Sequence, residues 1–392
     1  MPKKTVRDVE VAGRRVLVRV DFNVPLEEGR ITDDRRIREA LPTITYLAER
    51  GARVVLCSHL GRPKGRVVDS LRLAPVAVRL GELLGRPVRQ VHEVVGPEVE
   101  AAVASMRPGE VLLLENLRFH PGEESNDPVF ARQLAALADL YVNDAFGTAH
   151  RAHASTVGVA QHLPAVAGFL MEKELHHLGT ILDHPARPFV AILGGKKVED
   201  KVPVIRHLLS KADALLLGGA MSYTFLRARG LQVGTSLVEE ELVELAGELM
   251  AQAARREMDF VLPEDVVVAP SPEGGPIRVV AVEAIPPGWM GVDIGPRTRE
   301  RFTDFIRRAG TIFWNGPMGI FEVDAFSEGT RAVARALADS SAVTVVGGGD
   351  TAAAVEAAGV AGRITHISTG GGASLEFMEG KVLPGVAVLE DR

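Results

Sequence analysis

Short apolar runs rich in Val, Ile and Leu recur along the chain, and amphipathic stretches lie between them. Such runs are typical of strands buried on both faces of a parallel sheet, with helices as the connections. The alternation continues through all 392 residues, which is more than one hydrophobic core usually covers. We therefore predict an α/β fold with two doubly wound parallel sheets of the Rossmann-like kind, joined by a helix and hinge.

The predicted strands of the first half are residues 16–22, 54–58, 111–115 and 140–144. Those of the second half include residues 189–193, 214–217, 260–262, 311–314, 343–346 and 364–367. A helix is predicted between the two halves, at residues 170–182, and the prolines at 185 and 188 follow it.

Composition excludes several classes of protein. Residues 1–170 carry 23 Lys and Arg against 21 Asp and Glu (+2), and residues 171–392 carry 22 against 30 (−8). Neither half has the basic stripe of a nucleic-acid-binding protein. Because there is neither a membrane-length apolar stretch nor a secretory signal, we expect a cytoplasmic protein that does not contact membranes. The single cysteine, Cys57, excludes an intramolecular disulfide and is interpreted as a small core residue.

Arginine and histidine follow the predicted strands of the first half. Ligands of doubly wound sheets bind beyond the carboxyl ends of the strands, so these residues are expected to meet at one edge. Guanidinium groups bind small anions through paired hydrogen bonds. The pattern predicts a small-anion site built from five segments, which contain Asp21 and Asn23, Arg36, His59 and Arg62, Arg118 and His120, and His150, Arg151 and His153.

Some of these residues have simpler interpretations when each is taken alone. Asp21 and Asn23, which strand alternation would place on one face, could form the turn before Pro25. Arg36, expected in the first turn of a helix, could be an exposed solvated arginine. The coincidence of five segments favours the anion site. The histidines lack cysteine partners at metal-binding spacing, which disfavours a zinc site.

Glycine turns replace the arginines in the second half. They follow predicted strands at Gly194-Gly195, Gly218-Gly219, Gly347–Gly349 and Gly370–Gly372. Such turns present backbone N–H groups to the phosphates of a nucleotide. Because this half of the chain is acidic, nucleotide binding would depend on these amides, on a few lysines and on a divalent cation.

Lysine is scarce, with 9 residues against 36 arginines, yet Lys196, Lys197 and Lys201 fall within six residues. We predict that Lys197 and Lys201 share one face of a helix that follows the Gly194-Gly195 turn. There they would stabilise the charge on a phosphoryl group in transfer. A solvated basic turn is the alternative.

The GGGDT segment superficially fits a dinucleotide-binding fingerprint, since Gly347, Gly349 and Ala352 have its spacing. The acidic residue that would bind a ribose about 20 residues further on is missing. Asp350 instead follows the glycines, where it could bind Mg²⁺ on a polyphosphate, and Thr351 could cap the helix and contact phosphate. No Walker A sequence occurs. These features favour a phosphotransferase without a Walker loop.

The chain resembles the phosphoglycerate kinase family in nine motifs that occur in order: RVDFNVP, SHLGRP, ENLRFH, FGTAHRAH, LGGKKVEDK, WMGVDIGP, WNGPMGIFE, GGGDT and STGGGASLE. The resemblance implies a monomeric kinase that transfers a phosphoryl group between ATP and 3-phosphoglycerate, giving ADP and 1,3-bisphosphoglycerate, with Mg²⁺ as cofactor. It also implies a C-terminal end that folds back on the N-terminal domain. The expected organisation is a phosphoglycerate-binding domain at residues 1–169, an interdomain helix and hinge at 170–185, a nucleotide-binding domain at 186–375 and the returning segment at 376–392.

The resemblance implies three sets of site residues by motif position. The phosphoglycerate site would contain Asp21, Asn23, Arg36, His59, Arg62, Arg118 and Arg151. The nucleotide site would contain Gly195, Lys201, Gly219, Gly291, Asn315, Glu322, Gly348, Gly349, Asp350 and Thr351, with Asp350 as the Mg²⁺ contact. The phosphoryl group in transfer would be stabilised by Arg36, Lys197, Lys201, Gly371 and Gly372. Lys196 stands where the family usually has a small residue, and it either strengthens the local field or points to solvent.

The expected mechanism needs no general base, because the acceptor carboxylate is already ionised at neutral pH. Catalysis would depend on positioning and electrostatics, with Arg36 and Lys197 supplied by different domains whose closure also excludes water. Two rival interpretations are an NAD-dependent dehydrogenase and a two-domain anion-binding protein without chemistry. The missing ribose acid disfavours the first, and the missing export signal disfavours a periplasmic form of the second.

Overall fold

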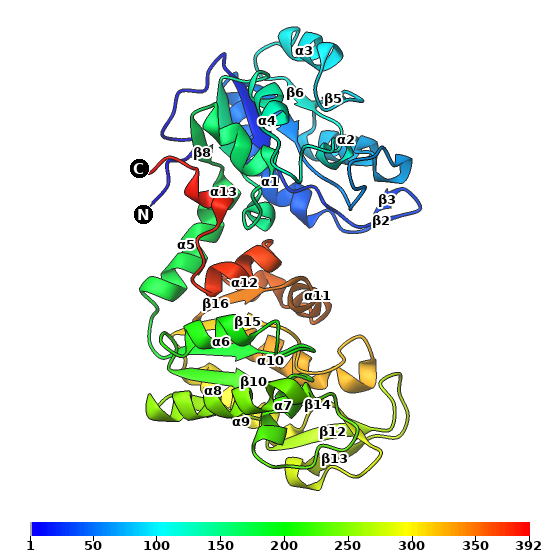
Figure 1. Cartoon of the computed structure of the whole chain (residues 1–392), viewed down its shortest axis with the longest axis vertical. Helices are drawn as coiled ribbons and strands as arrows, with labels where there is room; N and C mark the ends of the chain where they lie inside the picture. Colours follow the sequence, from blue (N-terminus) through cyan, green and yellow to red (C-terminus); the bar gives the residue numbers. More distant parts are fainter. Residues whose placement is uncertain (1) are drawn as a thin grey trace. The chain divides into compact units, whose positions relative to one another are not determined.

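The computed structural model describes residues 2–392, which divide into two units. The first unit contains residues up to His176 together with Val382–Arg392, and the second contains His177–Lys381. Each unit has a six-stranded sheet in which every strand pair is parallel, with helices beside it (Figure 1). The predicted α/β fold with two doubly wound parallel sheets is confirmed. Within residues 2–392, no helix combines the length and hydrophobicity needed to cross a membrane.

The first sheet is centred on β1 (Arg15–Arg19). Its strand order is β5 (Val88–Gln90), β6 (Val111–Leu113), β4 (Arg53–Cys57), β1, β7 (Leu140–Asn143) and β8 (Ala165–Ala167). Its helices are α1 (Arg35–Glu49), α2 (Ala74–Leu84), α3 (Pro97–Ala104) and α4 (Pro128–Ala135), and a short hairpin joins β2 (Leu26–Glu27) to β3 (Arg30–Ile31). The chain first builds the β4 side and then crosses to β7, so the strand order reverses beside β1. Ligands of doubly wound sheets bind at such a reversal.

The second sheet follows the same plan around β9 (Phe189–Leu193). Its order is β11 (Asp259–Val261), β10 (Ala214–Leu217), β9, β15 (Thr311–Asn315), β16 (Val343–Gly347) and β17 (His366–Ile367). Its helices are α6 (Val202–Leu208), α7 (Ser222–Ala228), α8 (Val243–Arg255), α9 (Pro296–Arg308), α10 (Glu328–Asp339), α11 (Gly349–Ala357) and α12 (Gly372–Met378). The order reverses between β9 and β15, which is the corresponding ligand position.

A small antiparallel sheet in the second unit was not predicted. It contains β13 (Arg278–Ala281), β12 (Asp265–Ala269) and β14 (Met290–Ile294). β12 is fully buried, whereas β13 is exposed at its start, and Val279 is 54% exposed. β13 is an edge strand of this sheet, and neither its run VVA nor the VVVA run of β12 was included among the predicted strands.

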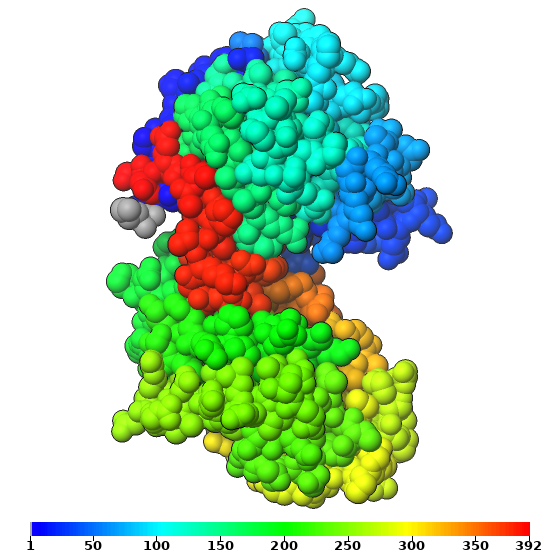
Figure 2. Space-filling view, viewed as in Figure 1, coloured from blue at the N-terminus to red at the C-terminus, as the bar shows by residue number. Residues whose placement is uncertain are grey.

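The C-terminal segment packs on the N-terminal residues of the first unit. Lys3 forms an ion pair of 2.8 Å with Asp391, and the Glu390 N–H donates to the Ala165 carbonyl over 2.9 Å. In α13 (Pro384–Ala387), the Gly385 carbonyl accepts a bond of 3.1 Å from Asn143 Nδ2. Figure 2 shows the end of the chain, in red, beside the blue N-terminal residues.

The helix predicted at residues 170–182 is present as α5 (Phe169–Asp183). Asp144, which directly follows β7, accepts hydrogen bonds at Oδ1 from the Leu170 and Met171 N–H groups, 2.9 and 3.3 Å long. The Thr43 hydroxyl accepts a further bond of 2.9 Å from the Phe169 N–H. Two polar side chains of the first unit therefore satisfy the N–H groups that begin α5. Cys57, interpreted as a core residue, is fully buried at the end of β4, and burial raises its pKa to about 12.

Asp144 makes stability dependent on pH. Burial raises its pKa to about 7, against the opposing effect of its hydrogen bonds. The folded protein therefore holds this proton up to about pH 7, whereas the unfolded chain releases it near pH 4. Through this group, stability falls as pH rises from about 4 to 7. We expect Asp144→Asn to gain about 2–3 kcal/mol relative to wild type between pH 5 and pH 8, measured by urea unfolding.

Asp139→Asn is the matched control. A hydrogen bond from Arg15 lowers the pKa of Asp139, so its contribution is present above its ordinary pKa and is lost only in acid. The stability difference between Asp139→Asn and wild type should stay constant from pH 5 to pH 8. A difference that is equally constant for Asp144→Asn would contradict the raised pKa of Asp144.

Candidate functional site

The loop after β1 carries the first predicted site residues. β1 ends at Arg19, so Asp21 and Asn23 lie beyond it, and the prediction that they share a strand face is wrong. They instead stabilise the loop, because Asp21 Oδ1 accepts from the Asn23 N–H over 3.1 Å. Asn23 Oδ1 accepts from the Gly61 N–H over 2.9 Å and so joins this loop to the one after β4.

Arg36 lies in the first turn of α1, as predicted. Its Nη1 is 3.0 Å from both carboxylate oxygens of Asp21. The Asp21 side chain is 8% exposed and the Arg36 side chain 34%. Asp21 therefore orients the guanidinium, part of which remains accessible to a ligand.

His59 is a buried imidazole on which the charges of several predicted arginines act. It is 3% exposed, and its Nδ1 is 3.1 Å from Nη2 of Arg19. Burial, followed by the charges of Arg19, Arg118, Arg36 and Arg151, holds the pKa of His59 well below its ordinary 6.5. His59 is therefore a neutral imidazole among cations, and arginines from three of the predicted segments act on the same ring.

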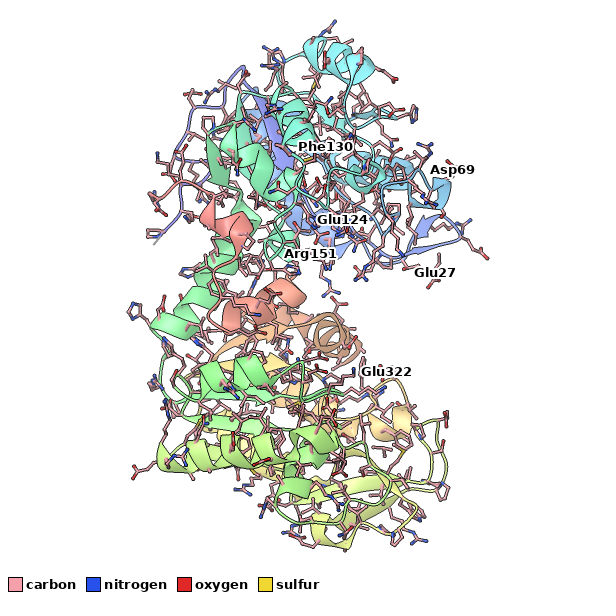
Figure 3. All side chains as sticks on the ribbon, viewed as in Figure 1. Glu27, Asp69, Glu124, Phe130, Arg151 and Glu322 are labelled. Carbon is pink, nitrogen blue, oxygen red and sulfur yellow. The ribbon has the colours of Figure 1, made fainter. Side chains whose placement is uncertain are left out.

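Arg118 is nearly buried and has unused donors. It is 3% exposed, and its Nη1 donates to the Gly61 carbonyl over 2.8 Å. Its Nε and Nη2 have no hydrogen-bond acceptor among the described residues, although Glu124 Oε1 lies 3.5 Å from Nε. Figure 3 labels Glu124 and Arg151, whose charges both act on Arg118. Because buried donors without acceptors are costly, a bound anion would relieve this arrangement.

The remaining candidates of the first unit differ in their surroundings. Arg62 is exposed directly after Gly61. His120 accepts from the Gly122 N–H at Nδ1, over 3.0 Å, and stacks on Phe130 with ring centroids 3.8 Å apart. The His153 N–H donates to Thr156 Oγ1 over 3.0 Å. His120 and His153 thus have structural contacts of their own.

In the second unit, the glycine turns after β9 and β10 pack against the turn after β15. The Gly195 N–H donates to the Pro317 carbonyl and the Gly219 N–H to the Met318 carbonyl, each over 2.9 Å. A Cβ on Gly219 would lie 2.6 Å from the Gly195 backbone. The prediction that these two turns offer N–H groups to phosphate is therefore wrong, because their glycines permit close backbone packing instead.

The N-terminus of α11 has the expected anion-binding character. Its N-cap is Gly348, with φ 93°, and no side chain of the described residues caps it. Its first N–H groups therefore have no partner within the helix. Asp350 is exposed in this first turn. The predicted cap by Thr351 is wrong, since its buried hydroxyl accepts from the Gly316 N–H over 2.7 Å.

The lysines do not share a helical face, contrary to prediction. α6 begins at Val202 with Lys201 as its N-cap, and Lys197 lies in the preceding turn. That turn is held by Glu239, whose carboxylate accepts from the Val198 N–H. Residues 197–201 therefore form a non-helical turn before α6 begins. Lys196 and Lys197 are both exposed.

Lys201 is linked to the α11 end of the site. Its ammonium donates to Asn315 Oδ1, and Asn315 Nδ2 donates to the Gly347 carbonyl over 2.9 Å. Burial lowers the pKa of Lys201, while Asp200, Asp350 and Glu379 oppose this. Asn315 therefore holds the ammonium beside the turn that begins α11.

The other predicted nucleotide residues are more dispersed. Gly291 lies in β14, where a Cβ would be 1.7 Å from Tyr223 Oη. The packing of Tyr223 is therefore enough by itself to require glycine at this position. Glu322 is exposed and is labelled in Figure 3. Gly371, with φ 52°, is the N-cap of α12, which begins at Gly372 and contributes Ser374 to the surroundings of Gly347.

A cavity of about 600 Å³ lies elsewhere in the second unit, beside β11. Its lining includes Met250, Phe260 and Arg229, and the described residues around it include none of the predicted nucleotide-binding residues. This cavity and the candidate site are therefore separate.

Arg19, Glu123, Ser155 and Glu239 were not identified from the sequence, although they contact site residues or the segments that carry them. Arg19 had a signal, since it is a single charge inside the apolar run VLVRV. The other three residues have no local pattern that separates them from surface residues.

Comparison with known proteins gives relatives over the whole chain. The family model described as phosphoglycerate kinase matches residues 6–381. Phosphoglycerate kinases of Moorella thermoacetica and Pelotomaculum thermopropionicum are 62% and 60% identical over 393 residues, covering 100% of each chain. The solved phosphoglycerate kinase of Coxiella burnetii has a TM-score of 0.91 at 41% identity, and that of Pyrococcus horikoshii 0.87 at 35%. Each covers 99% of this chain and 98% of its own.

Proposed function

The chain belongs to the phosphoglycerate kinase family, and from this premise we propose how its residues divide the transfer of a phosphoryl group between ATP and 3-phosphoglycerate. It is a glycolytic and gluconeogenic phosphotransferase, and the dehydrogenase and binding-protein alternatives are not favoured. The observation that carries the assignment of residues is that the charges of Arg36, Arg118 and Arg151 all act on one buried imidazole, His59.

In this proposal the first unit binds 3-phosphoglycerate. The substrate carries a phosphate and a carboxylate, and both are acceptors for guanidinium donors. The unused donors of Arg118 and the accessible part of Arg36 support this assignment. The full proposed set is Asp21, Asn23, Arg36, His59, Arg62, Arg118 and Arg151.

In the second unit, the N-terminus of α11 would bind nucleotide phosphates through its backbone N–H groups. Asp350 would hold Mg²⁺, which usually binds one or two carboxylates together with substrate phosphates, so one exposed carboxylate in this helical turn fits the ion. When bound, Mg²⁺ neutralises charge on the phosphates. The proposed nucleotide set is Lys201, Gly291, Asn315, Glu322, Gly348, Gly349, Asp350 and Thr351; Gly195 and Gly219 are left out because their N–H groups bond to the turn after β15.

The chemistry would be a direct in-line transfer. The carboxylate of 3-phosphoglycerate attacks without a general base, because it is already ionised. Arg36, Lys197 and Lys201, with the amides of Gly371 and Gly372, would stabilise the charge on the phosphoryl group. We propose that the protein acts as a cytoplasmic monomer and that a hinge movement completes the site and excludes water.

A coupled assay tests the activity directly. We expect turnover that requires ATP, 3-phosphoglycerate and Mg²⁺ together. Turnover that depends on NAD in place of ATP, or no turnover with all three ligands, would contradict the assignment.

Small-angle scattering tests the hinge movement separately. We expect ATP and 3-phosphoglycerate together to lower the radius of gyration, and each ligand alone to lower it less. An unchanged radius with both ligands bound, in protein that is active in the assay, would contradict closure but not the kinase activity.

A further inference from the structure

A buried arginine contacts His59, and each nitrogen of its guanidinium group forms a hydrogen bond. Arg19, in the central strand β1, is 0% exposed. Its Nε donates to Ser155 Oγ over 2.8 Å and its Nη1 to the Val20 carbonyl over 2.5 Å, while its Nη2 is 3.1 Å from His59 Nδ1. A buried charge is costly unless it is paired and hydrogen-bonded. Because Arg19 is fully enclosed, it cannot itself be a substrate ligand in this arrangement.

The counter-charge reaches Arg19 through a serine. Glu123 is also 0% exposed, and its Oε2 accepts from the Ser155 N–H over 3.0 Å. Its Oε1 accepts from Ser155 Oγ over 2.5 Å. The Ser155 hydroxyl thus receives a hydrogen bond from Arg19 and donates one to Glu123. Burial raises the pKa of Glu123, and the charge of Arg19 opposes that rise.

The direction of the last hydrogen bond follows from chemistry. A guanidinium has donors only, so His59 Nδ1 must be the acceptor in its contact with Arg19. The ring is neutral, and its one proton is therefore on Nε2. An Nε2–H group can donate to an anion without adding a further positive charge to a site that already holds Arg36, Arg118 and Arg151.

We propose that Arg19, held by Ser155 and Glu123, is a positioning residue that fixes His59 as the Nε2–H tautomer, so that His59 donates a hydrogen bond to the acceptor substrate. The proposal rests on the proposed function, because it takes His59 to be a ligand of 3-phosphoglycerate. It assigns different roles to two kinds of arginine: those with accessible or unused donors bind the anion, and the fully enclosed Arg19 sets the protonation of the imidazole.

The first test is the tautomer itself. Nitrogen-15 NMR of histidine in the full-length protein distinguishes protonated from unprotonated ring nitrogens, and His59→Gln identifies the His59 signals. We expect Nδ1 to be unprotonated and Nε2 protonated in the ligand-free wild type. A proton on Nδ1 would overturn the proposal. The NMR measurement does not depend on enzymatic activity, so it still tests the tautomer if the assay contradicts the proposed function.

The second test removes Arg19 without leaving a buried charge. The double variant Arg19→Met, Glu123→Gln takes out both charges, and replacing a buried ion pair together is often tolerated. We expect a mixture of His59 tautomers and a KM for 3-phosphoglycerate raised about tenfold. The KM for ATP and kcat should stay within about twofold, because a ground-state contact is lost.

Tyr141→Phe is the matched control. It removes a bond of 2.7 Å from Tyr141 Oη to the Ser155 carbonyl in the same core, but it leaves the Glu123, Ser155 and Arg19 side-chain bonds intact. We expect a comparable loss of thermal stability with an unchanged tautomer and KM. A folded double variant that keeps the wild-type tautomer or the wild-type KM would overturn the proposal.

Ser155→Ala decides the question if the double variant does not fold. It deletes only the bridging hydroxyl and should raise the KM for 3-phosphoglycerate by about threefold or more, with partial loss of the single tautomer. Unchanged values for both quantities would overturn the proposal.

Discussion

Arg36→Ala is expected to lower kcat about a thousandfold while the affinity for ATP changes less than about twofold. Asp21 holds the Arg36 guanidinium through both of its oxygens, at the start of α1, with part of it accessible. The proposed nucleotide residues all belong to the second unit, so nucleotide binding should not depend on this side chain. The coupled assay gives kcat, and calorimetry gives the affinity for ATP.

The controls separate lost catalysis from lost structure. Arg38→Ala changes an exposed arginine on the same helix, paired with Asp34 at 2.8 Å, and should keep kcat within about twofold. The double variant Asp21→Asn, Arg36→Ala removes the nearly buried carboxylate that Arg36→Ala leaves unpaired. If Arg36→Ala abolished ATP binding, the assignment of two separate sites would be wrong.

The sequence predicted the central strands well because their burial produces continuous apolar runs. β9 and β10 have the predicted bounds, and β1, β4 and β7 differ by a few residues. Strand ends were less predictable, since they depend on where pairing with a neighbour stops. β1 pairs with β4 only as far as Arg19 and Cys57, which moved Asp21 into a loop.

The residues of the candidate site were easier to predict than their contacts. The rule that ligands bind at the carboxyl ends of parallel strands brought Arg36, His59 and Arg118 together without any coordinates. The rule that glycine turns offer N–H groups failed at Gly195 and Gly219, because the same N–H groups can bond to a neighbouring turn. Whether a backbone donor is free depends on tertiary packing, which spacing does not encode.

Buried partners were beyond the reach of sequence patterns. Ser155 bridges Glu123 and Arg19 across 32 and 136 residues of the chain. Glu239 binds the lysine turn from 41 residues away. Such long-range contacts are made by the fold, and a single glutamate or serine in a sequence gives no sign of them.

Lys201→Met is expected to lower kcat about a hundredfold to a thousandfold. Burial lowers the pKa of the ammonium, and its hydrogen-bond partner is the neutral amide of Asn315 rather than a carboxylate. A partly desolvated charge without direct neutralisation can act strongly on a phosphoryl group. Methionine keeps most of the side-chain volume, so the change is chiefly the loss of charge and of one donor to Asn315.

The three neighbouring lysines make the experiment specific. Lys196 is exposed, and if its side chain points to solvent, Lys196→Met should keep kcat within about twofold. A tenfold loss of kcat would mean that Lys196 strengthens the positive field on the phosphoryl group. Lys197 is equally exposed and lies in the turn held by Glu239. If Lys197→Met lost activity while Lys201→Met kept it, the ammonium of Lys197 alone would stabilise the charge on the transferred phosphoryl group. The link from Lys201 through Asn315 to Gly347 would then serve only to hold the turn before α11 in place.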